Sequence, residues 1–122
     1  MSNDRQKHIK HAQKESLYLK EISRLFLHIT ADDPALRELH VSRVKLSPDK
    51  SLCTVYFYTP AGQEGFREKM EQLILYKPSL RHALAQKISS RYTPDLRFSF
   101  DKQFEKQKHL ESLLESISKK SQ

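Results

Sequence analysis

The chain has 122 residues, with 22 lysines and arginines against 15 acidic residues, and a formal net charge of +7 at pH 7. This length is typical of one compact domain, and the basic surplus favours acidic partners. The chain has only two glycines and a single cysteine, Cys53, which argues against a dinucleotide-binding fingerprint, an ATPase-type phosphate loop, an internal disulfide and a thiolate zinc cluster.

The first periodic segment covers residues 12–29, where apolar side chains recur at helical spacing and charged ones lie opposite. We expect one buried stripe in this helix, made of Leu17, Tyr18, Ile22, Leu25, Phe26 and Ile29. The basic residues 1–11 are predicted to be flexible. The helix should end before Ala31, and Asp33 is placed to cap a short turn that begins at Pro34.

A β-hairpin is predicted next. Residues 38–46 alternate between apolar and polar side chains, but the alternation slips by one between Val41 and Val44, which indicates a bulge. Residues 47–50 have the composition of a turn, and residues 52–59 are the most β-prone run of the chain.

Helical spacing returns after Pro60 and predicts a helix over residues 63–75, with four side chains facing inward: Phe66, Met70, Leu73 and Ile74. Pro78 interrupts this pattern, so we expect a break or kink at Tyr76, Lys77, Pro78 and Ser79, followed by a second helix. A third strand is predicted over residues 96–100 and a final helix over residues 104–117. We expect the final helix to pack on the sheet through Leu110, Leu113, Leu114 and Ile117.

This order of elements predicts an α+β fold, in which a three-stranded sheet carries helices packed on one face. The predicted organisation is a flexible basic N-terminus over residues 1–11, a folded domain over residues 12–103, and a C-terminal helix and tail over residues 104–122. No apolar run approaches the roughly 20 residues of a membrane helix or forms a signal core, and a lone cysteine suits a reducing compartment. We therefore expect a cytoplasmic protein with no membrane partner.

Positive charge is concentrated between residues 77 and 97, which hold five lysines and arginines and one acid. Four of these cations precede Asp95 with no acid between them, so local ion-pair partners are scarce: Lys77, Arg81, Lys87 and Arg91. We interpret them as a surface that binds phosphate groups, and the alternative is an ordinary solvated helix face.

No catalytic constellation is present. The histidines lack companions at metal-ligand spacing, and Cys53, in mid-strand, is expected to be a buried and inert thiol. The segment from Gly62 to Gly65 has the GxxG form of a KH RNA-binding loop, but it joins a strand to a helix and contains Glu64. We interpret it as the start of a helix. We expect no enzymatic activity, no cofactor, no metal and no small-molecule substrate.

Several short motifs follow one another along the chain: Glu21-Ile22-Ser23, Asp33-Pro34-x-Leu36, Val44-x-Leu46-Ser47-x-Asp49-x-Ser51, Val55-Tyr56, Leu80-Arg81-x-x-Leu84-Ala85 and Arg91-x-Thr93-Pro94-x-Leu96-x-Phe98-x-x-Asp101. In this order and spacing the chain resembles the ribosome-binding factor A family from about residue 12 to residue 117. The resemblance implies a type II KH-like fold in which an Ala-x-Gly kink replaces the GxxG loop. In this chain Tyr76 stands at the alanine position and Pro78 at the glycine position.

The resemblance also implies a function. Members bind the free 30S subunit, assist late maturation and processing of the 5′ region of 16S rRNA, and are important during growth in the cold. We expect a monomer that contacts rRNA phosphates through six cations: Arg43, Lys45, Lys77, Arg81, Lys87 and Arg91. Two alternatives stay open, namely a general KH-like nucleic-acid-binding protein without ribosomal specificity and a protein-interaction adaptor that acts through its C-terminal helix.

Overall fold

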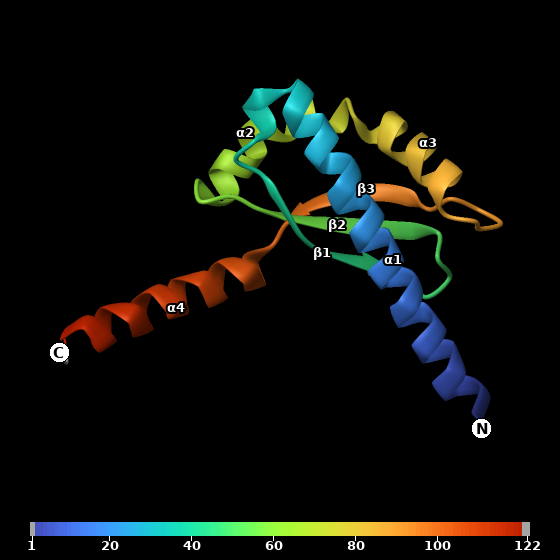
Figure 1. The fold of residues 1–122 in the computed structure, drawn as a ribbon, viewed down its shortest axis with the longest axis horizontal. Helices are drawn as coiled ribbons and strands as arrows, with labels where there is room; N and C mark the ends of the chain where they lie inside the picture. The colour runs from blue at the N-terminus through green and yellow to red at the C-terminus, as the bar shows by residue number, and fades with distance from the viewer. Residues whose placement is uncertain (1, 121–122) are drawn as a thin grey trace.

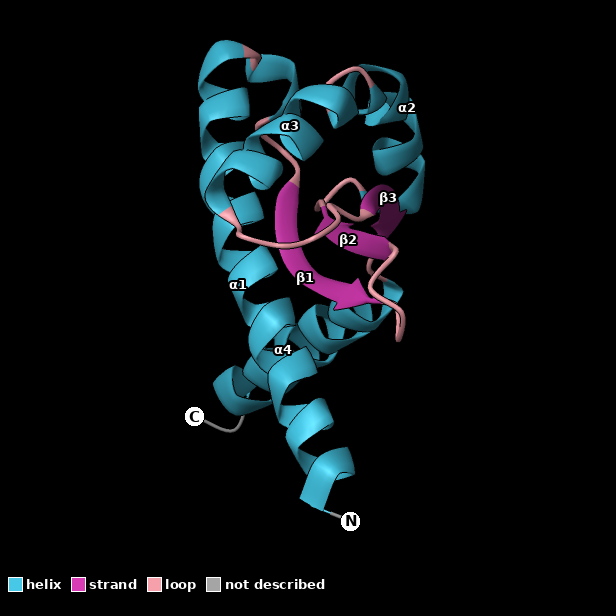
Figure 2. Ribbon diagram, turned by 90° about the vertical axis from the view of Figure 1, so that its right-hand side faces the viewer, coloured by secondary structure: helices cyan, strands magenta, loops and turns pink. Residues whose placement is uncertain are grey.

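The computed structural model describes residues 2–120, which form four α-helices, one 3-10 turn and a three-stranded sheet. In chain order the elements are α1 (Ser2–Asp32), η1 (Pro34–Leu36), β1 (His40–Leu46), β2 (Leu52–Tyr58), α2 (Gly62–Ile74), α3 (Lys77–Lys87), β3 (Asp95–Phe100) and α4 (Lys102–Lys120). The central strand β2 pairs antiparallel with β1 and parallel with β3. Helices α1, α2 and α3 cover one face of the sheet (Figures 1 and 2), which confirms the predicted α+β architecture.

The core lies between the sheet and these three helices. Cys53, Val55 and Phe57 of β2 are fully buried on the helix side. The Phe57 ring lies 5.2, 6.0 and 5.4 Å, centre to centre, from the rings of Phe26, Phe66 and Phe98. The alternate residues Leu52, Thr54, Tyr56 and Tyr58 are only partly buried, so the opposite face of the sheet is partly open.

Helix α1 is longer than predicted, since it begins at Ser2 rather than near residue 12 and continues to Asp32 rather than ending before Ala31. Tyr18, Ile22 and Phe26 form its buried stripe, as expected. Leu17 is 41% exposed, contrary to the prediction, because it lies about 100° round the helix from Tyr18 and therefore at the flank of the stripe. The Glu15 carboxylate accepts a hydrogen bond from the Leu46 amide at 2.9 Å, so α1 also satisfies a polar group of the edge strand β1.

Asp33 precedes the short turn η1 as predicted, but its side chain makes no capping hydrogen bond. Asp33 Oδ2 instead accepts a hydrogen bond from the Tyr76 hydroxyl at 3.0 Å. This bond to a carboxylate raises the pKa of Tyr76 above its usual value. The contact ties the end of α1 to the junction between α2 and α3, although the two residues are far apart in sequence.

The break between α2 and α3 falls where the sequence predicts it. Pro78 lies in the first turn of α3, where a missing amide costs no intrahelical bond. Tyr76 is the residue before α3, and its amide donates to the Leu73 carbonyl at 3.1 Å. Ile74 is 46% exposed rather than inward, because α2 ends at this residue and the chain turns away.

The start of α2 explains both glycines. Gly62 has a positive φ of 77°, a conformation that side chains disfavour. A Cβ atom on Gly65 would collide with the Ala61 side chain. The GxxG segment is therefore a helix start, as predicted, but its glycines are required by the backbone conformation at Gly62 and by the closeness of Ala61 to Gly65.

The predicted bulge in β1 is confirmed, since the pairing register with β2 shifts between Val41 and Arg43. Ser42 is the extra residue, and its hydroxyl donates to the Tyr56 carbonyl at 3.2 Å. The bulge places Arg43 directly opposite Tyr56 in the sheet.

Helix α4 projects away from the sheet (Figure 1) instead of packing on it. Its four stripe residues are about half exposed or more: Leu110 56%, Leu113 49%, Leu114 56% and Ile117 63%. The prediction of sheet packing was wrong because α1, α2 and α3 already occupy one face of the sheet (Figure 2), and the opposite face carries the charged side chains of Arg43, Lys45 and Arg97. The start of α4 does contact the sheet, with the Phe104 ring 4.9 Å from the ring of Tyr58. Between residues 2 and 120, no helix combines the length and apolarity that crossing a bilayer requires.

Candidate nucleic-acid interface

Three of the predicted cations lie on α3 and the loop after it, and we call them the α3 surface: Lys77 and Arg81 approach Phe98 and Asp95 of β3, and Arg91 lines a hollow together with Arg81. A hollow of about 480 Å³ lies between α3 and the loop that follows it. It is lined by Pro78, Arg81, His82, Ala85, Arg91, Tyr92 and Thr93. Basic side chains beside a concave surface can neutralise phosphate groups of a nucleic acid.

Arg81 is not free of partners, contrary to the expectation from local spacing. Its Nη2 donates to the Thr93 carbonyl at 2.9 Å and its Nε to the Pro94 carbonyl at 3.2 Å. Its guanidinium also lies 3.5 Å from the Asp95 carboxylate. Arg81 therefore holds the loop before β3 as well as contributing charge.

The other two cations of the α3 surface are held more loosely. Lys77 is partly buried, and its Nζ lies 5.7 Å from the centre of the Phe98 ring. Arg91 is exposed, with its guanidinium carbon 5.4 Å from the centre of the Tyr92 ring. Both positive charges can turn toward an anion without breaking an ion pair.

Lys87 does not join this group. It is the last residue of α3, and by helical position it lies about 120° round the helix from Arg81. The sequence placed it with the others because all four cations are close in the chain. Arg81 and Lys87 are six residues apart, which is not close to a whole number of helical turns, so their side chains leave α3 in different directions.

Arg43 and Lys45 lie on a different surface of the molecule. Arg43 pairs with Tyr56 and Lys45 with Thr54, and these residues alternate with the buried side of β2. Residues paired directly across two strands share one face of a sheet. Both cations therefore point from the helix-free face, and they do not extend the α3 surface as a second row.

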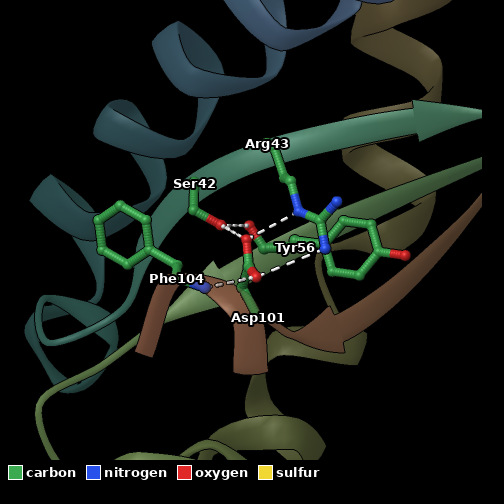
Figure 3. A network of polar contacts seen from close by, with 5 residues as sticks. All are labelled: Ser42, Arg43, Tyr56, Asp101 and Phe104. Atoms are coloured by element: carbon green, nitrogen blue, oxygen red, sulfur yellow. Dashed lines mark hydrogen bonds and ion pairs between the residues drawn. The ribbon is translucent and has the colours of Figure 1, made fainter. Parts of the chain in front are cut away.

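The orientation of Arg43 is set by a polar network (Figure 3). Its Nε donates to Asp101 Oδ2 at 2.9 Å, and its guanidinium carbon lies 4.1 Å from the centre of the Tyr56 ring. Asp101 also accepts hydrogen bonds from the Ser42 hydroxyl at 2.7 Å and from the Phe104 amide at 3.0 Å. Asp101 thus caps α4 and holds Arg43 at the same time.

Asp101 is buried, with a relative exposure of 2%. Burial by itself raises the pKa of a carboxyl group, but the hydrogen bonds from Phe104, Ser42 and Arg43 and the charge of Arg43 outweigh it. The pKa of Asp101 is therefore lowered, and the group is charged at neutral pH. The charged form is the one that holds Arg43.

Sequence reasoning missed three cations on the helix-free face: Arg97, Lys102 and Lys106. Arg97 is directly across from Thr54, so it lies on the same face as Lys45. Lys102 and Lys106 come from the start of α4 and line a hollow of about 440 Å³ together with Arg43, Tyr56, Ser99, Phe100 and Gln103. The period-two alternation of β3 indicates that Arg97 is exposed, but only the strand pairing places it beside Lys45.

A buried cysteine and a third basic hollow lie outside these two surfaces. Burial, with a smaller contribution from the charge of Glu15, raises the pKa of the Cys53 thiol to about 12, so this buried thiol is inert as predicted. The N-terminal turns of α1 and the turn between β1 and β2 line a further basic hollow of about 480 Å³, through Lys7, His8, Lys10, His11, Pro48 and Lys50.

Comparison with known proteins gives consistent results. The family model described as ribosome-binding factor A matches residues 10–114. The chain is 36% identical over 110 residues to a ribosome-binding factor A from Methylocella silvestris, covering 88% of this chain and 64% of that protein. It is 32% identical over 111 residues to one from Prochlorococcus marinus subsp. pastoris, covering 89% of this chain and 83% of the relative. The chain therefore spans slightly less than two thirds of the Methylocella protein.

The fold is also similar to that of a solved relative. The crystal structure of ribosome-binding factor A from Thermus thermophilus aligns with a TM-score of 0.63 and 28% sequence identity. The alignment covers 73% of this chain and 93% of that chain. This likeness places the domain among the KH-like folds, as the sequence motifs predict.

Proposed function

This chain belongs to the ribosome-binding factor A family, and we propose that it is a non-enzymatic ribosome biogenesis factor that binds the free 30S subunit. The observation that carries the proposal is the family match over residues 10–114 on a fold like that of the solved relative. In the cytoplasm, the protein would act as a monomer in late maturation of the 5′ region of 16S rRNA, with its largest effect during growth in the cold.

We propose that the α3 surface contacts rRNA phosphates. Lys77 and Arg81 lie one turn apart on α3, and a hollow lined by Arg81 and Arg91 would give the nucleic acid access to these two arginines. Phosphate contacts supply affinity that depends on salt, whereas the shape of an rRNA junction supplies selectivity. Lys87 and the basic residues 2–11 in the first turns of α1 would make accessory contacts.

The first experiment is to sediment a cell lysate through a gradient at moderate salt and detect the protein across the fractions. We expect it in the 30S peak and not in the 70S peak. A strain that lacks the protein should accumulate 16S rRNA with an unprocessed 5′ end, most strongly at low temperature. An even distribution across the gradient would leave a general nucleic-acid-binding protein and contradict the ribosomal role.

The α3 surface is tested by the double variant Lys77→Glu with Arg91→Glu. It spares Arg81, which holds the loop before β3. We expect weaker binding to purified 30S subunits and a smaller dependence of binding on salt, because two phosphate contacts are lost. The matched control is Lys20→Glu with Arg67→Glu, which reverses the same charge on exposed positions of α1 and α2. Equal binding by the two double variants would contradict this surface.

A second candidate function is a protein-interaction adaptor that acts through α4. The observation that favours it is the exposed stripe from Leu110 to Ile117, which the part of the chain described leaves uncovered. A chain that ends at residue 107 separates the two functions. Retained 30S binding and loss of a protein partner would support the adaptor, whereas unchanged protein contacts would exclude it.

A further inference from the structure

The fold has basic side chains on two opposite sides of the sheet. Lys77 of the α3 surface lies beside Phe98, whose ring contacts Phe57 in the core on the helix side. The second group lies on the helix-free face and at the start of α4, and we call it the sheet surface: Arg43, Lys45, Arg97, Lys102 and Lys106. The sheet itself separates the two groups, so a single strand of RNA cannot lie flat against both at one point.

Arg43 is already oriented in the absence of a ligand. The Asp101 carboxylate holds one edge of its guanidinium, and the Tyr56 ring covers one of its flat sides. The Arg43 side chain is still 45% exposed, and its Nη1 amino group has no protein partner within residues 2–120. A fixed guanidinium with a free flat side can stack on an unpaired base while its free N–H groups contact phosphate. Less conformational entropy is lost on binding because the group is already positioned.

The positively charged side chains near Arg43 favour the binding of an anionic polymer. Lys45 and Arg97 flank Thr54 from the two neighbouring strands, and adjacent strands put them about 10 Å apart at the backbone. The hollow beside Arg43 is lined by two further cations, Lys102 and Lys106, and by no acidic residue. The positive charge therefore continues from β1 and β3 across to the first turns of α4.

We propose that the sheet surface is a separate binding site for single-stranded RNA, so that one chain holds two RNA segments at once. The inference rests on the proposed function, because the α3 surface supplies the first RNA contact. A stacked arginine beside a concave, acid-free hollow fits an unpaired segment, whose bases are available for stacking. The protein would then hold two parts of an immature rRNA close together on opposite sides of its sheet.

The sheet surface is tested by Lys45→Glu with Lys106→Glu. Both side chains are exposed and neither belongs to the network of Asp101, so the fold should be retained, which circular dichroism checks. Binding of a short labelled single-stranded oligoribonucleotide is measured by fluorescence anisotropy over a range of salt concentrations. We expect the magnitude of the salt slope to fall by about 1.4, since each lost contact with a single strand removes about 0.7. An affinity equal to that of Lys20→Glu with Arg67→Glu would overturn the proposal.

Simultaneous binding is tested with two oligoribonucleotides, one carrying a donor dye and the other an acceptor dye. The wild-type chain should bring them together and produce energy transfer, which excess protein should abolish by separating the two RNAs onto different chains. The α3 variant Lys77→Glu with Arg91→Glu and the sheet variant should each bind one RNA without energy transfer. No transfer with the wild-type chain, or full transfer with the sheet variant, would overturn the inference.

Two further outcomes separate this inference from the proposed function. If 30S binding depends on the α3 surface but not on the sheet surface, the ribosomal role stands and the second site is wrong. If polyglutamate displaces the oligoribonucleotide from the α3 variant as well as RNA itself does, the sheet surface is a site for acidic proteins, and the proposal of an RNA site is overturned.

Discussion

The two terminal helices, α1 and α4, carry similar apolar stripes but have opposite environments. The stripe of α1 is buried, with Ile22 only 1% exposed, whereas Leu113 in the middle of the α4 stripe is 49% exposed. The difference arises from the sheet, because one face is covered by helices before α4 begins and the other face carries charged side chains rather than an apolar surface. An amphipathic pattern therefore shows that a helix has an apolar face, but the rest of the fold decides whether that face is buried within the chain.

The sharpest test of this comparison is Ile22→Ala. We expect the free energy of unfolding to fall by about 2–5 kcal/mol, because the change leaves a cavity in a packed core. Chemical denaturation followed by circular dichroism measures the loss. A loss below about 0.5 kcal/mol, the range of surface substitutions, would mean that α1 is not packed as described.

Substitutions at the start of α4 should change the free energy of unfolding more than substitutions in its apolar stripe. Asp101→Ala removes the helix cap and the partner of Arg43, and we expect a loss of about 1–3 kcal/mol of stability. Asp101→Asn is the matched control, since an amide can still cap the helix but carries no charge for Arg43. Equal stability of the wild-type chain and the alanine variant would contradict the network.

Acid should weaken the same network. The pKa of Asp101 is lowered in the folded chain, so its contribution to stability is present in full above its unfolded pKa of about 3.9. It declines as the pH falls below that value and is lost below the folded pKa. The wild-type chain should therefore lose its stability advantage over Asp101→Asn in this acidic range. A difference between the two proteins that does not change with pH would contradict the charged network.

The smallest effect is expected for Leu113→Ala, the counterpart of Ile22→Ala on the exposed stripe. The free energy of unfolding should change by no more than about 0.5 kcal/mol, because the side chain leaves no cavity in the core. The same denaturation measurement applies. A loss near that of Ile22→Ala would show that α4 packs against the rest of the chain in solution.

Most elements of the fold were predictable because their signals are local. The hairpin, the bulge before Arg43 and the break at Pro78 each depend on a few neighbouring residues, and the structure confirms them. The errors concern contacts between distant parts of the chain. Asp33 was expected to cap its own turn, but Tyr76 reaches it from another helix junction. Competition between local and distant partners cannot be read from a local pattern.

The candidate binding residues were also predictable only in part. The sequence by itself determined the basic surplus, its concentration after residue 76 and the family motifs, because charge and motif order are properties of the chain. Only the tertiary structure decided that the six predicted cations do not form one surface. Strand pairing places Arg43 and Lys45 on the helix-free face of the sheet. Arg97 lies on the same face, across Thr54 from Lys45, because pairing joins residues that are far apart in sequence. The layered fold then placed the sheet between the two basic surfaces.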